Sequence, residues 1–487
     1  MLDRVNPNAS GSAELHPARE PTVIPRPEHN LSRADMSRNA VKVLYRLKEA
    51  GFQAFLVGGS VRDMLLGIVP KDFDVATDAH PEEVAGLFRN CRLIGRRFRL
   101  AHVRFGREII EVATFRGRGD GADEGNGDGE DHATLRVQDE GGRILRDNIY
   151  GTIEEDVWRR DFTANALYYT IADFSIWDYV GGVADVRARV LRLIGDPETR
   201  YREDPVRMLR AVRFAAKLDF TLAPETAAPI GSLAPLLSEV PPARLFEEVL
   251  KLFHGGHARV TFEHLREFGL LGQLFPLAEA AFAGPNGEQL LALARLAMDN
   301  TDERIAADRS VNPMFVFAVL LWGAIRDRAA ALLLEDGGSE SQALSEAAAQ
   351  IIFEQQAHIA LPRRFAAPLR EMVALQPRFL QMRGRRARRL LDNKRFRAAY
   401  DFLLLRTETG EADPAVARWW TELQEQSAEA QQKSLQQPPD DDAVDDPDDG
   451  PADGTGDDVA PRPRRRRGGR RRRGGRGGAG GGGGTGS

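Results

Sequence analysis

Two aspartates separated by one residue follow a glycine turn and an arginine within a short stretch of this chain. The turn is Gly58-Gly59 with Arg62 close behind it, and the acidic pair is Asp72 and Asp74. Because side chains alternate between the two faces of a strand, the two carboxylates are expected to point the same way. Carboxylates facing one cleft repel each other unless a cation lies between them. Mg2+ binds one or two carboxylates together with substrate phosphates, so the spacing predicts metal-dependent phosphoryl transfer.

The glycine turn also predicts an anion site. Phe52 to Val57 is an apolar run typical of a strand, and a helix is expected to begin near Val61. Backbone N–H groups at a glycine turn and a helix start attract anions, and Arg62 adds a positive charge suited to a triphosphate. Each half of the pattern has a structural alternative, since glycine pairs before helices are common and Asp-x-Asp is often a solvated strand face. Their combination in this order favours catalysis.

A third carboxylate, Glu111, lies in the apolar run from Ile109 to Ala113. This run predicts a strand, in which Glu111 is in register to face the same cleft as the aspartate pair. There it would deprotonate an attacking hydroxyl or complete a metal site. The alternative is an exposed strand residue that pairs with Arg104 or Arg116.

Two further segments carry charged residues where helices are expected to begin. In the first, Arg159 and Arg160 precede Asp161, which is expected to be the N-cap of a helix. The arginines would bind phosphate or ribose with Asp161 holding them, and the structural alternative is a capping residue with arginines covering the preceding turn. The two descriptions are compatible, because a residue at the rim of a cleft can both cap a helix and hold the arginines that bind the ligand.

In the second segment, Pro205 suits the first turn of a helix, with Glu203 and Asp204 just before it. Arg207 and Arg210 are three residues apart and are expected to share a face with the acids one turn earlier. Such a pattern is usually a salt-bridged surface. Beside a nucleotide cleft it would instead read the edge of a base, because guanidinium and carboxylate groups offer donors and acceptors.

A basic run in the second half of the chain predicts binding of RNA through its phosphates, because Asp392 is the only acid within it. Its cations are Arg383, Arg385, Arg386, Arg388, Arg389, Lys394, Arg395 and Arg397. The aromatic residues nearby, Tyr400, Trp419 and Trp420, are expected to pack helices rather than stack on bases.

The chain of 487 residues, 42% of them hydrophobic, is long enough for two or three domains. Its single cysteine excludes an internal disulfide framework and fits a reducing compartment. The longest apolar run, Met314 to Ile325, is too short to cross a bilayer, so no integral membrane segment and a cytoplasmic location are expected. The net charge of −5 combines ten aspartates in residues 440–458 with ten arginines in residues 462–476.

Hydrophobic periodicity predicts an α+β protein. Strands near residues 52–57, 72–75, 93–94, 100–104 and 109–115, with helices between them, indicate a mixed sheet. Residues 118–142 are rich in Gly, Asp and Glu and predict a flexible insertion. From Pro205 onward almost every segment has helical period, so the second half is expected to be all-helical.

Four motifs in this order resemble the class II nucleotidyltransferases, which include tRNA CCA-adding enzymes and bacterial poly(A) polymerases. They are Gly58-Gly59-x-Val61-Arg62-Asp63, Asp72-x-Asp74, Arg160-Asp161-Phe162-Thr163-x-Asn165-Ala166 and Glu203-Asp204-x-x-Arg207-x-x-Arg210. The segment from Leu93 to Val103 and the arginine-rich terminus are similar to the bacterial poly(A) polymerase I branch.

The resemblance implies a head (36–195), a helical neck (196–260) that selects the nucleotide, an RNA-binding helical body (261–430), and disordered termini (1–35 and 431–487). It implies that Asp72 and Asp74 hold two Mg2+ ions and that Glu111 or Asp161 completes the catalytic set. The expected nucleotide-binding residues are Gly58, Gly59, Arg62, Arg159, Arg160, Asn165, Glu203, Asp204, Arg207 and Arg210.

The implied reaction is template-independent transfer of AMP from ATP to RNA 3′ ends with release of pyrophosphate, in support of RNA turnover. One alternative is a tRNA CCA-adding enzyme, and an alternative of another class is an RNA-binding adaptor with an inactive head. ATP and RNA 3′ ends are the expected partners and a monomer the expected state. Whether an RNA chaperone or degradation machinery also binds is left open.

Overall fold

The computed structural model describes residues 20–95, 99–117, 137–138, 144–146 and 150–426. Both predicted tail blocks and most of the predicted insertion lie outside these ranges. Two short strands, β7 (Val137–Gln138) and β8 (Ile144–Arg146), form an antiparallel pair near the end of the insertion. Val137 and Gln138 were expected to lie in a structureless loop, so that prediction is wrong for these two residues.

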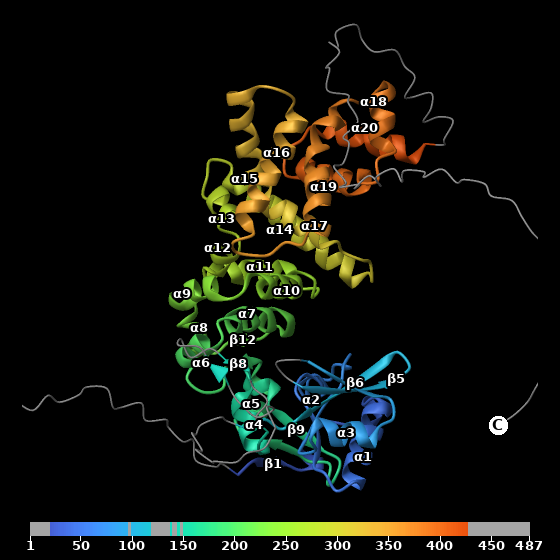
Figure 1. Cartoon of the computed structure of the whole chain (residues 1–487), viewed down its shortest axis with the longest axis vertical. Helices are drawn as coiled ribbons and strands as arrows, with labels where there is room; N and C mark the ends of the chain where they lie inside the picture. The colour runs from blue at the N-terminus through green and yellow to red at the C-terminus, as the bar shows by residue number, and fades with distance from the viewer. Residues whose placement is uncertain (1–19, 96–98, 118–136, 139–143, 147–149, 427–487) are drawn as a thin grey trace, which may run out of the picture. The chain divides into compact units, whose positions relative to one another are not determined.

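The N-terminal half contains an eight-stranded mixed sheet with the order β1-β10-β9-β2-β3-β6-β5-β4. Figure 1 labels four of its strands, β1, β9, β6 and β5. The sheet's only parallel pair among the described strands joins β3 to β6. The strands are β1 (Thr22–Ile24), β2 (Ala54–Val57), β3 (Asp74–Thr77), β4 (Cys91–Ile94), β5 (Leu100–Phe105), β6 (Glu108–Thr114), β9 (Leu167–Thr170) and β10 (Ile176–Asp178).

Helices cover both faces of the sheet, which explains why all four residues of β2 are buried. Leu56 of β2 packs with Val43 and Leu47 of α1 (Arg38–Glu49) in the larger core. Phe55, on the opposite face, packs with Val157 of α4 (Ile153–Arg159) in a second core. The remaining head helices are α2 (Gly59–Leu65), α3 (Pro81–Leu87) and α5 (Gly182–Ala188).

Two predictions about local structure were wrong. Residues 1–35 were expected to be disordered, but residues 22–24 form the edge strand β1, which pairs with β10 through Thr22 and Asp178. Two short 3-10 helices, η1 (Arg26–Glu28) and η2 (Arg33–Asp35), follow it. Asp161 was expected to cap the start of a helix, but α4 ends just before it at Arg159. A short 3-10 turn, η3 (Thr163–Asn165), follows, and then β9 begins. The charged residues therefore lie at a helix end, where the chain turns into a strand.

The rest of the described chain is helical, apart from a short parallel pair formed by β11 (Val190–Leu191) and β12 (Thr221–Leu222). No described helix is long and apolar enough to cross a membrane. The helices are α6 (Pro197–Glu203), α7 (Val206–Leu218), α8 (Pro224–Ala227), α9 (Ile230–Leu233), α10 (Pro242–Phe253), α11 (Ala258–Glu267), α12 (Leu270–Leu274), α13 (Pro276–Phe282), α14 (Gly287–Ala306), α15 (Pro313–Asp336), α16 (Glu340–Gln355), α17 (Arg363–Ala374), α18 (Gly384–Leu391), α19 (Phe396–Glu408) and α20 (Pro414–Glu425).

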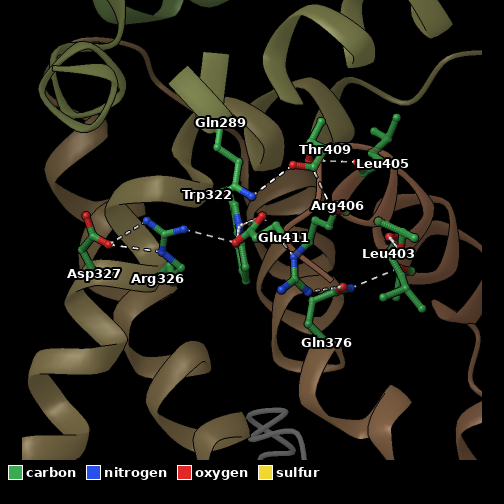
Figure 2. Close-up of polar contacts among 12 residues, drawn as sticks. Gln289, Trp322, Arg326, Asp327, Gln376, Leu403, Leu405, Arg406, Thr409 and Glu411 are labelled. Carbon is green, nitrogen blue, oxygen red and sulfur yellow. Dashed lines mark hydrogen bonds and ion pairs between the residues drawn. The ribbon is translucent and has the colours of Figure 1, made fainter. Parts of the chain in front are cut away.

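A carboxylate in the loop between α19 and α20 joins two of these helices. Figure 2 shows Glu411 between the indole of Trp322 and the guanidinium groups of Arg326 and Arg406. Trp322 Nε1 donates to both Glu411 oxygens, at 2.7 and 2.9 Å. The ion pairs to Arg326 and Arg406 are 3.3 and 3.4 Å long. Glu411 thereby ties α15 to α19. Trp420 is fully buried, as expected for a packing residue.

Candidate active site

The glycine turn lies at the end of the buried strand β2. Gly58 has a φ of +75°, a conformation that favours glycine. A Cβ atom on Gly58 would lie 3.7 Å from Nη1 of Arg160, and one on Gly59 would lie 3.4 Å from Nη2 of Arg62. Each glycine therefore has one guanidinium group alongside it. The helix that follows the turn, α2, begins at Gly59 rather than near Val61.

The two aspartates lie at the start of β3. Asp74 is the first residue of the strand, and Asp72 precedes it in an extended segment. Phe73 and Val75 are buried, whereas both aspartates are exposed. Exposed and buried residues thus alternate as expected, although the strand itself begins two residues later than predicted.

Glu111 and His102 extend this acidic site across two more strands. Asp74 is in register with Glu111 in the parallel β3–β6 pair, and Glu111 is in register with His102 in the antiparallel β6–β5 pair. His102 Nε2 lies 3.3 Å from Glu111 Oε2. Since their neighbours Val75 and Val112 pack into the larger core, all three side chains face the side that α4 covers. The expected common face of Asp74 and Glu111 is therefore present, and His102 was not predicted.

The acidic site is strained electrostatically. Although Asp74 is solvent-accessible, the surrounding protein removes part of its hydration. This desolvation, together with the nearby carboxylates of Glu111 and Asp72, raises the pKa of Asp74 to about 6, although Arg160 opposes the rise. Clustered carboxylates resist ionisation unless a cation is present. A bound cation would therefore stabilise this cluster of carboxylates most when Asp74 is ionised.

Mg2+ fits this donor set. Among the described residues, no group of three or more His, Cys, Asp and Glu side chains is arranged so that it could hold a metal ion. Mg2+ does not require such a group, because it retains several waters and binds through one or two carboxylates plus substrate phosphates. Asp72 and Asp74 provide carboxylates of that kind, and the neighbouring Glu111 adds to the negative charge that a cation would offset.

Arg160 is held in place by two buried side chains, Asp156 and Tyr168. Its Nη2 donates to Asp156 Oδ2 at 2.9 Å and its Nε to Tyr168 Oη at 2.7 Å. Tyr168 Oη in turn donates to Asp156 at 2.5 Å. Burial opposes the charged form of Arg160, but Tyr168 and Asp156 raise its pKa above the ordinary value. The guanidinium is thus fixed beside Gly58.

Asp156 and Tyr168 were not identified from the sequence. Asp156 is four residues before Arg160, a spacing that places two side chains on one helical face, so the sequence contains a signal for this pair. Tyr168 is reached only because β9 lies beside α4, and the sequence contains no signal for that contact. Arg159 turns elsewhere and donates to the carbonyl oxygen of Gly117 at 2.5 Å.

Arg62 lies below the surface and is connected to the second charged segment. Its Nη2 pairs with Asp63 at 2.6 Å, and its Nη1 donates to the side chain of Asn165. Asn165 donates to Asp161 at 3.4 Å, and Asp161 accepts from Arg210 at 2.8 Å. Burial alone would raise the pKa of Asp161, but Arg210 lowers it below the ordinary value. Four predicted site residues therefore form one bonded chain.

The remaining predicted residues of the neck pair separately. Arg207 donates to Glu203 at 2.9 Å, while Asp204 pairs with Arg244 of α10 at 2.7 Å. Glu203 is the last residue of α6 and Arg207 belongs to α7. Arg210 was expected to face the same acids, but its partner is Asp161. Arg200, which was not predicted, also donates to Glu203, at 2.7 Å.

The basic run extends from the N-cap of α18 through that helix and the following turn into the first turn of α19. Arg385 and Arg388 are exposed and form no ion pair with another described residue. In contrast, Arg395 pairs with Glu371 of α17 at 2.8 Å and Arg397 with Asp401 at 3.0 Å. Lys394 also approaches Glu371, at 3.7 Å. The acid that pairs with Lys394 and Arg395 thus comes from a neighbouring helix, which the local sequence did not indicate, whereas Asp401 follows Arg397 by one turn of the same helix.

Comparisons with protein families match three parts of the chain. Residues 54–192 match the Poly A polymerase head domain, and residues 219–282 match the Probable RNA and SrmB-binding site of polymerase A. Residues 336–473 match the Polymerase A arginine-rich C-terminus.

Comparisons with curated proteins find long and short matches. Poly(A) polymerase I of Salmonella typhi is 49% identical over 423 residues, covering 86% of this chain and 89% of the relative. Poly(A) polymerase I of Escherichia coli O157:H7 is 50% identical over 417 residues, covering 85% and 88%. The CCA-adding enzyme of Bacillus subtilis is 39% identical over 235 residues, which cover 48% of this chain and 55% of the relative.

A solved structure has a similar fold. The Bacillus stearothermophilus CCA-adding enzyme in complex with CTP superposes with a TM-score of 0.54 at 26% identity. The match covers 80% of this chain and 84% of that one. The similarity thus extends from the mixed sheet into the helical part.

Proposed function

Because this chain belongs to the bacterial poly(A) polymerase I family, we propose that its mixed-sheet head transfers AMP from ATP to RNA 3′ ends. The protein is a polynucleotide adenylyltransferase, which extends RNA without a template and releases pyrophosphate. One observation supports this activity above all. The poly(A) polymerase relatives match about 85% of the chain, whereas the CCA-adding relative above matches 48%. The longer match includes the helical half as well as the head.

The carboxylates would act at the reacting atoms. Asp72 and Asp74 would hold Mg2+, with two ions expected. When bound, Mg2+ supplies charge stabilisation at the α-phosphate and the departing pyrophosphate and favours ionisation of the attacking hydroxyl. Glu111, in register with Asp74, would accept the proton of the RNA 3′-hydroxyl as that oxygen attacks the α-phosphate. Asp161 is less suited to this role because it is paired with Arg210.

The glycine turn and its arginines would hold the triphosphate. Gly58 and Gly59 let the backbone approach the phosphates closely, and a side chain at Gly58 would be strained. Arg160 contributes positive charge beside Gly58, and the more deeply placed Arg62 does so beside Gly59. Neither guanidinium has to change position as charge develops on the phosphates, because a carboxylate already holds each of them in place.

The neck would contact the base of the incoming nucleotide, and the body would bind the RNA. Glu203 and Arg207, joined at 2.9 Å, would offer an acceptor and a donor to the edge of the incoming base. The helical body would hold RNA by its backbone, with the exposed arginines of α18 contributing salt-dependent affinity. This division follows the boundaries 36–195, 196–260 and 261–430 proposed from the sequence.

A primer-extension assay tests the proposal. Purified protein with Mg2+ is given a generic RNA oligonucleotide or a tRNA lacking its terminal residues, each with ATP, CTP or both. Long A tails on the generic RNA, absent in Asp72→Asn/Asp74→Asn and retained in Asp219→Asn, are the expected result. Asp219 is a matched control because its side chain is 97% exposed.

Other products would identify another activity. Addition confined to the tRNA, with CTP required before ATP, would assign a CCA-adding enzyme. RNA binding without incorporation of any nucleotide would assign an adaptor with an inactive head.

A further inference from the structure

A cavity of about 300 Å3 lies between the segment that joins β1 to α1 and the strand β9. Its lining residues are Arg26, Ser32, Arg33, Ala34, Tyr169 and Phe174. Neighbouring residues of a strand face opposite sides of its sheet. Tyr169 accordingly packs in the larger core, whereas Tyr168, which holds Arg160, packs in the second core. The cavity is therefore on the other face of the sheet from Asp74 and Glu111.

Two positive charges border this cavity, and no acidic residue lines it. Arg26 Nη1 donates to the carbonyl oxygen of His29 at 2.9 Å, and Arg33 Nη1 donates to Tyr45 Oη at 2.8 Å. The guanidinium carbon of Arg33 also lies 4.8 Å from the ring centroid of Phe174. Neither arginine forms an ion pair within the part of the chain that the structure describes. Both charges are therefore available to an anion.

Tyr169 contributes a buried hydroxyl group to the same cavity. Its side chain is only 1% exposed, yet its Oη forms no hydrogen bond with another described residue. Burial raises the pKa of Tyr169, and the nearby charges of Arg33 and Arg26 oppose the rise. The hydroxyl thus keeps its proton at neutral pH close to both guanidinium groups. Since buried polar groups are normally hydrogen-bonded, this hydroxyl is a donor for a ligand.

The segment that carries the two arginines is held by its central residues. The buried His29 accepts from the N–H of Leu31 through Nδ1 at 3.2 Å, so its proton is on Nε2. Nε2 donates to the carbonyl oxygen of Phe174 at 2.9 Å. Asn30 donates to the carbonyl oxygen of Met64 in α2 at 3.1 Å. These contacts fix the segment against both the turn after β9 and the helix α2.

The wall of the cavity includes a strained residue. Phe174 has a φ of +66°, in the left-handed region that residues other than glycine rarely adopt. The contacts of its carbonyl oxygen with His29 and of its ring with Arg33 keep it there. Backbone strain of this kind is concentrated at ligand sites, where surrounding contacts enforce it.

A phosphate group fits this set of donors. Guanidinium groups form charge-assisted hydrogen bonds with phosphate oxygens, and the hydroxyl of Tyr169 adds a neutral donor. Ser32 Oγ accepts from the backbone of Ala34 at 3.2 Å, and its own proton has no acceptor among the described residues. Because Arg26 and Arg33 are exposed, a phosphate attached to a larger molecule can also reach the cavity.

We propose that Arg26, Arg33 and Tyr169 form a phosphate-binding site that is separate from the proposed nucleotide site. Free inorganic phosphate and the backbone of RNA both carry the required chemistry. The proposal goes beyond AMP transfer and does not depend on it, because the cavity is on the opposite face of the sheet from the proposed catalytic carboxylates.

Isothermal titration calorimetry of the full-length protein with inorganic phosphate, in the absence of Mg2+ and ATP, tests the proposal. Arg26→Gln/Arg33→Gln is expected to weaken phosphate binding about 10-fold to 100-fold, because it removes charged hydrogen bonds. Tyr169→Phe removes only the hydroxyl and is expected to weaken binding about 3-fold to 10-fold. Arg189→Gln/Arg202→Gln is the matched control, since both arginines are exposed and lie outside the cavity.

RNA binding over a salt series identifies the source of the phosphate. Weaker phosphate binding with unchanged RNA affinity in Arg26→Gln/Arg33→Gln would assign the site to a free anion. A slope of log affinity against log salt that is lower by about 0.7 would assign it to one phosphate of single-stranded RNA. Wild-type phosphate binding together with wild-type RNA affinity in this double variant would overturn the proposal. Neither measurement requires AMP transfer, so failure of the proposed polymerase activity would be a separate result.

Discussion

Asp161 Oδ2 accepts hydrogen bonds from both Nε and Nη2 of Arg210, at 2.8 and 2.5 Å. The other oxygen of Asp161 accepts from the backbone of Phe162 and from Asn165. Asn165 also accepts from Arg62, which pairs with Asp63. The loop after α4 is thereby tied to α7 on one side and to α2 on the other. Residues proposed to contact the phosphates and the base share one continuous set of polar contacts.

Breaking this connection is expected to lower stability and nucleotide discrimination together. Asp161→Asn leaves the Arg210 guanidinium without its charged partner, and we expect a loss of about 1–3 kcal/mol in the free energy of unfolding. Urea unfolding measures this loss, and the ratio of ATP to CTP incorporation is expected to fall. Since the pKa of Asp161 is lowered, its stabilisation is present above the ordinary value and is lost as pH falls through the lowered pKa.

The coupling between the two residues is measured by combining Asp161→Asn with Arg210→Gln. The double variant is expected to lose less stability than the sum of the single losses, because each single variant already removes the ion pair. Strictly additive losses would contradict a direct pairing in solution.

The aspartate pair is expected to be essential for the chemical step. Asp72→Asn or Asp74→Asn removes a proposed metal ligand, and we expect kcat to fall by about 1,000-fold or more. The matched control is Asp219→Asn, in which an exposed aspartate outside the site is changed. AMP incorporation at saturating ATP and primer is the measurement. Full activity in either site variant would rule out the proposed metal ligands.

Mg2+ binding is expected to weaken in mild acid. The pKa of Asp74 is raised to about 6, so protons compete with the cation as pH falls toward that value. In the metal-free protein a raised pKa favours folding at low pH, and this contribution is lost as pH rises through about 6. The rise in Tm on adding Mg2+ is therefore expected to be larger at alkaline than at acidic pH. Asp74→Asn is expected to remove this pH dependence, and its persistence would assign it to another group.

Glu411 is expected to be important for the stability of the helical body. Glu411→Gln leaves Arg326 and Arg406 without their shared carboxylate (Figure 2), and we expect a loss of about 3 kcal/mol in the free energy of unfolding. Glu408→Gln, an exposed glutamate on α19, is the control. Thermal unfolding checks the difference, and equal Tm values for the two variants would show that the contacts of Glu411 contribute no net stability.

The exposed arginines of α18 are expected to contribute more to RNA affinity than the paired cations that follow them. Arg385→Gln/Arg388→Gln is expected to reduce the slope of log affinity against log salt by about 1.4, the value for two contacts with single-stranded RNA. Arg395→Gln/Arg397→Gln removes the same charge, but those arginines already pair with Glu371 and Asp401. RNA binding over a salt series compares the two variants, and a larger effect of the second would contradict the expectation.

The parts of the site that depend only on residues adjacent in the chain could be predicted from the sequence. Strand alternation placed Asp72 and Asp74 on one side because Phe73 and Val75 must be buried. The positive φ of Gly58 follows from a strand that leaves its sheet through a tight turn. The expectation for Asp161 was wrong because a helix end and a helix start carry similar residues, and only the packing of α4 against the sheet distinguishes them.

Contacts between distant segments required the tertiary structure. The alternation of Asp74 with buried neighbours is a local property of the chain, but its register with Glu111 depends on the crossover that makes β3 and β6 parallel. Similarly, Asp161 meets Arg210 across 49 residues and Trp322 meets Glu411 across 89. A charge can be recognised in a sequence, but its partner is chosen by the fold, because burial makes unpaired charges costly and brings remote elements together to compensate them.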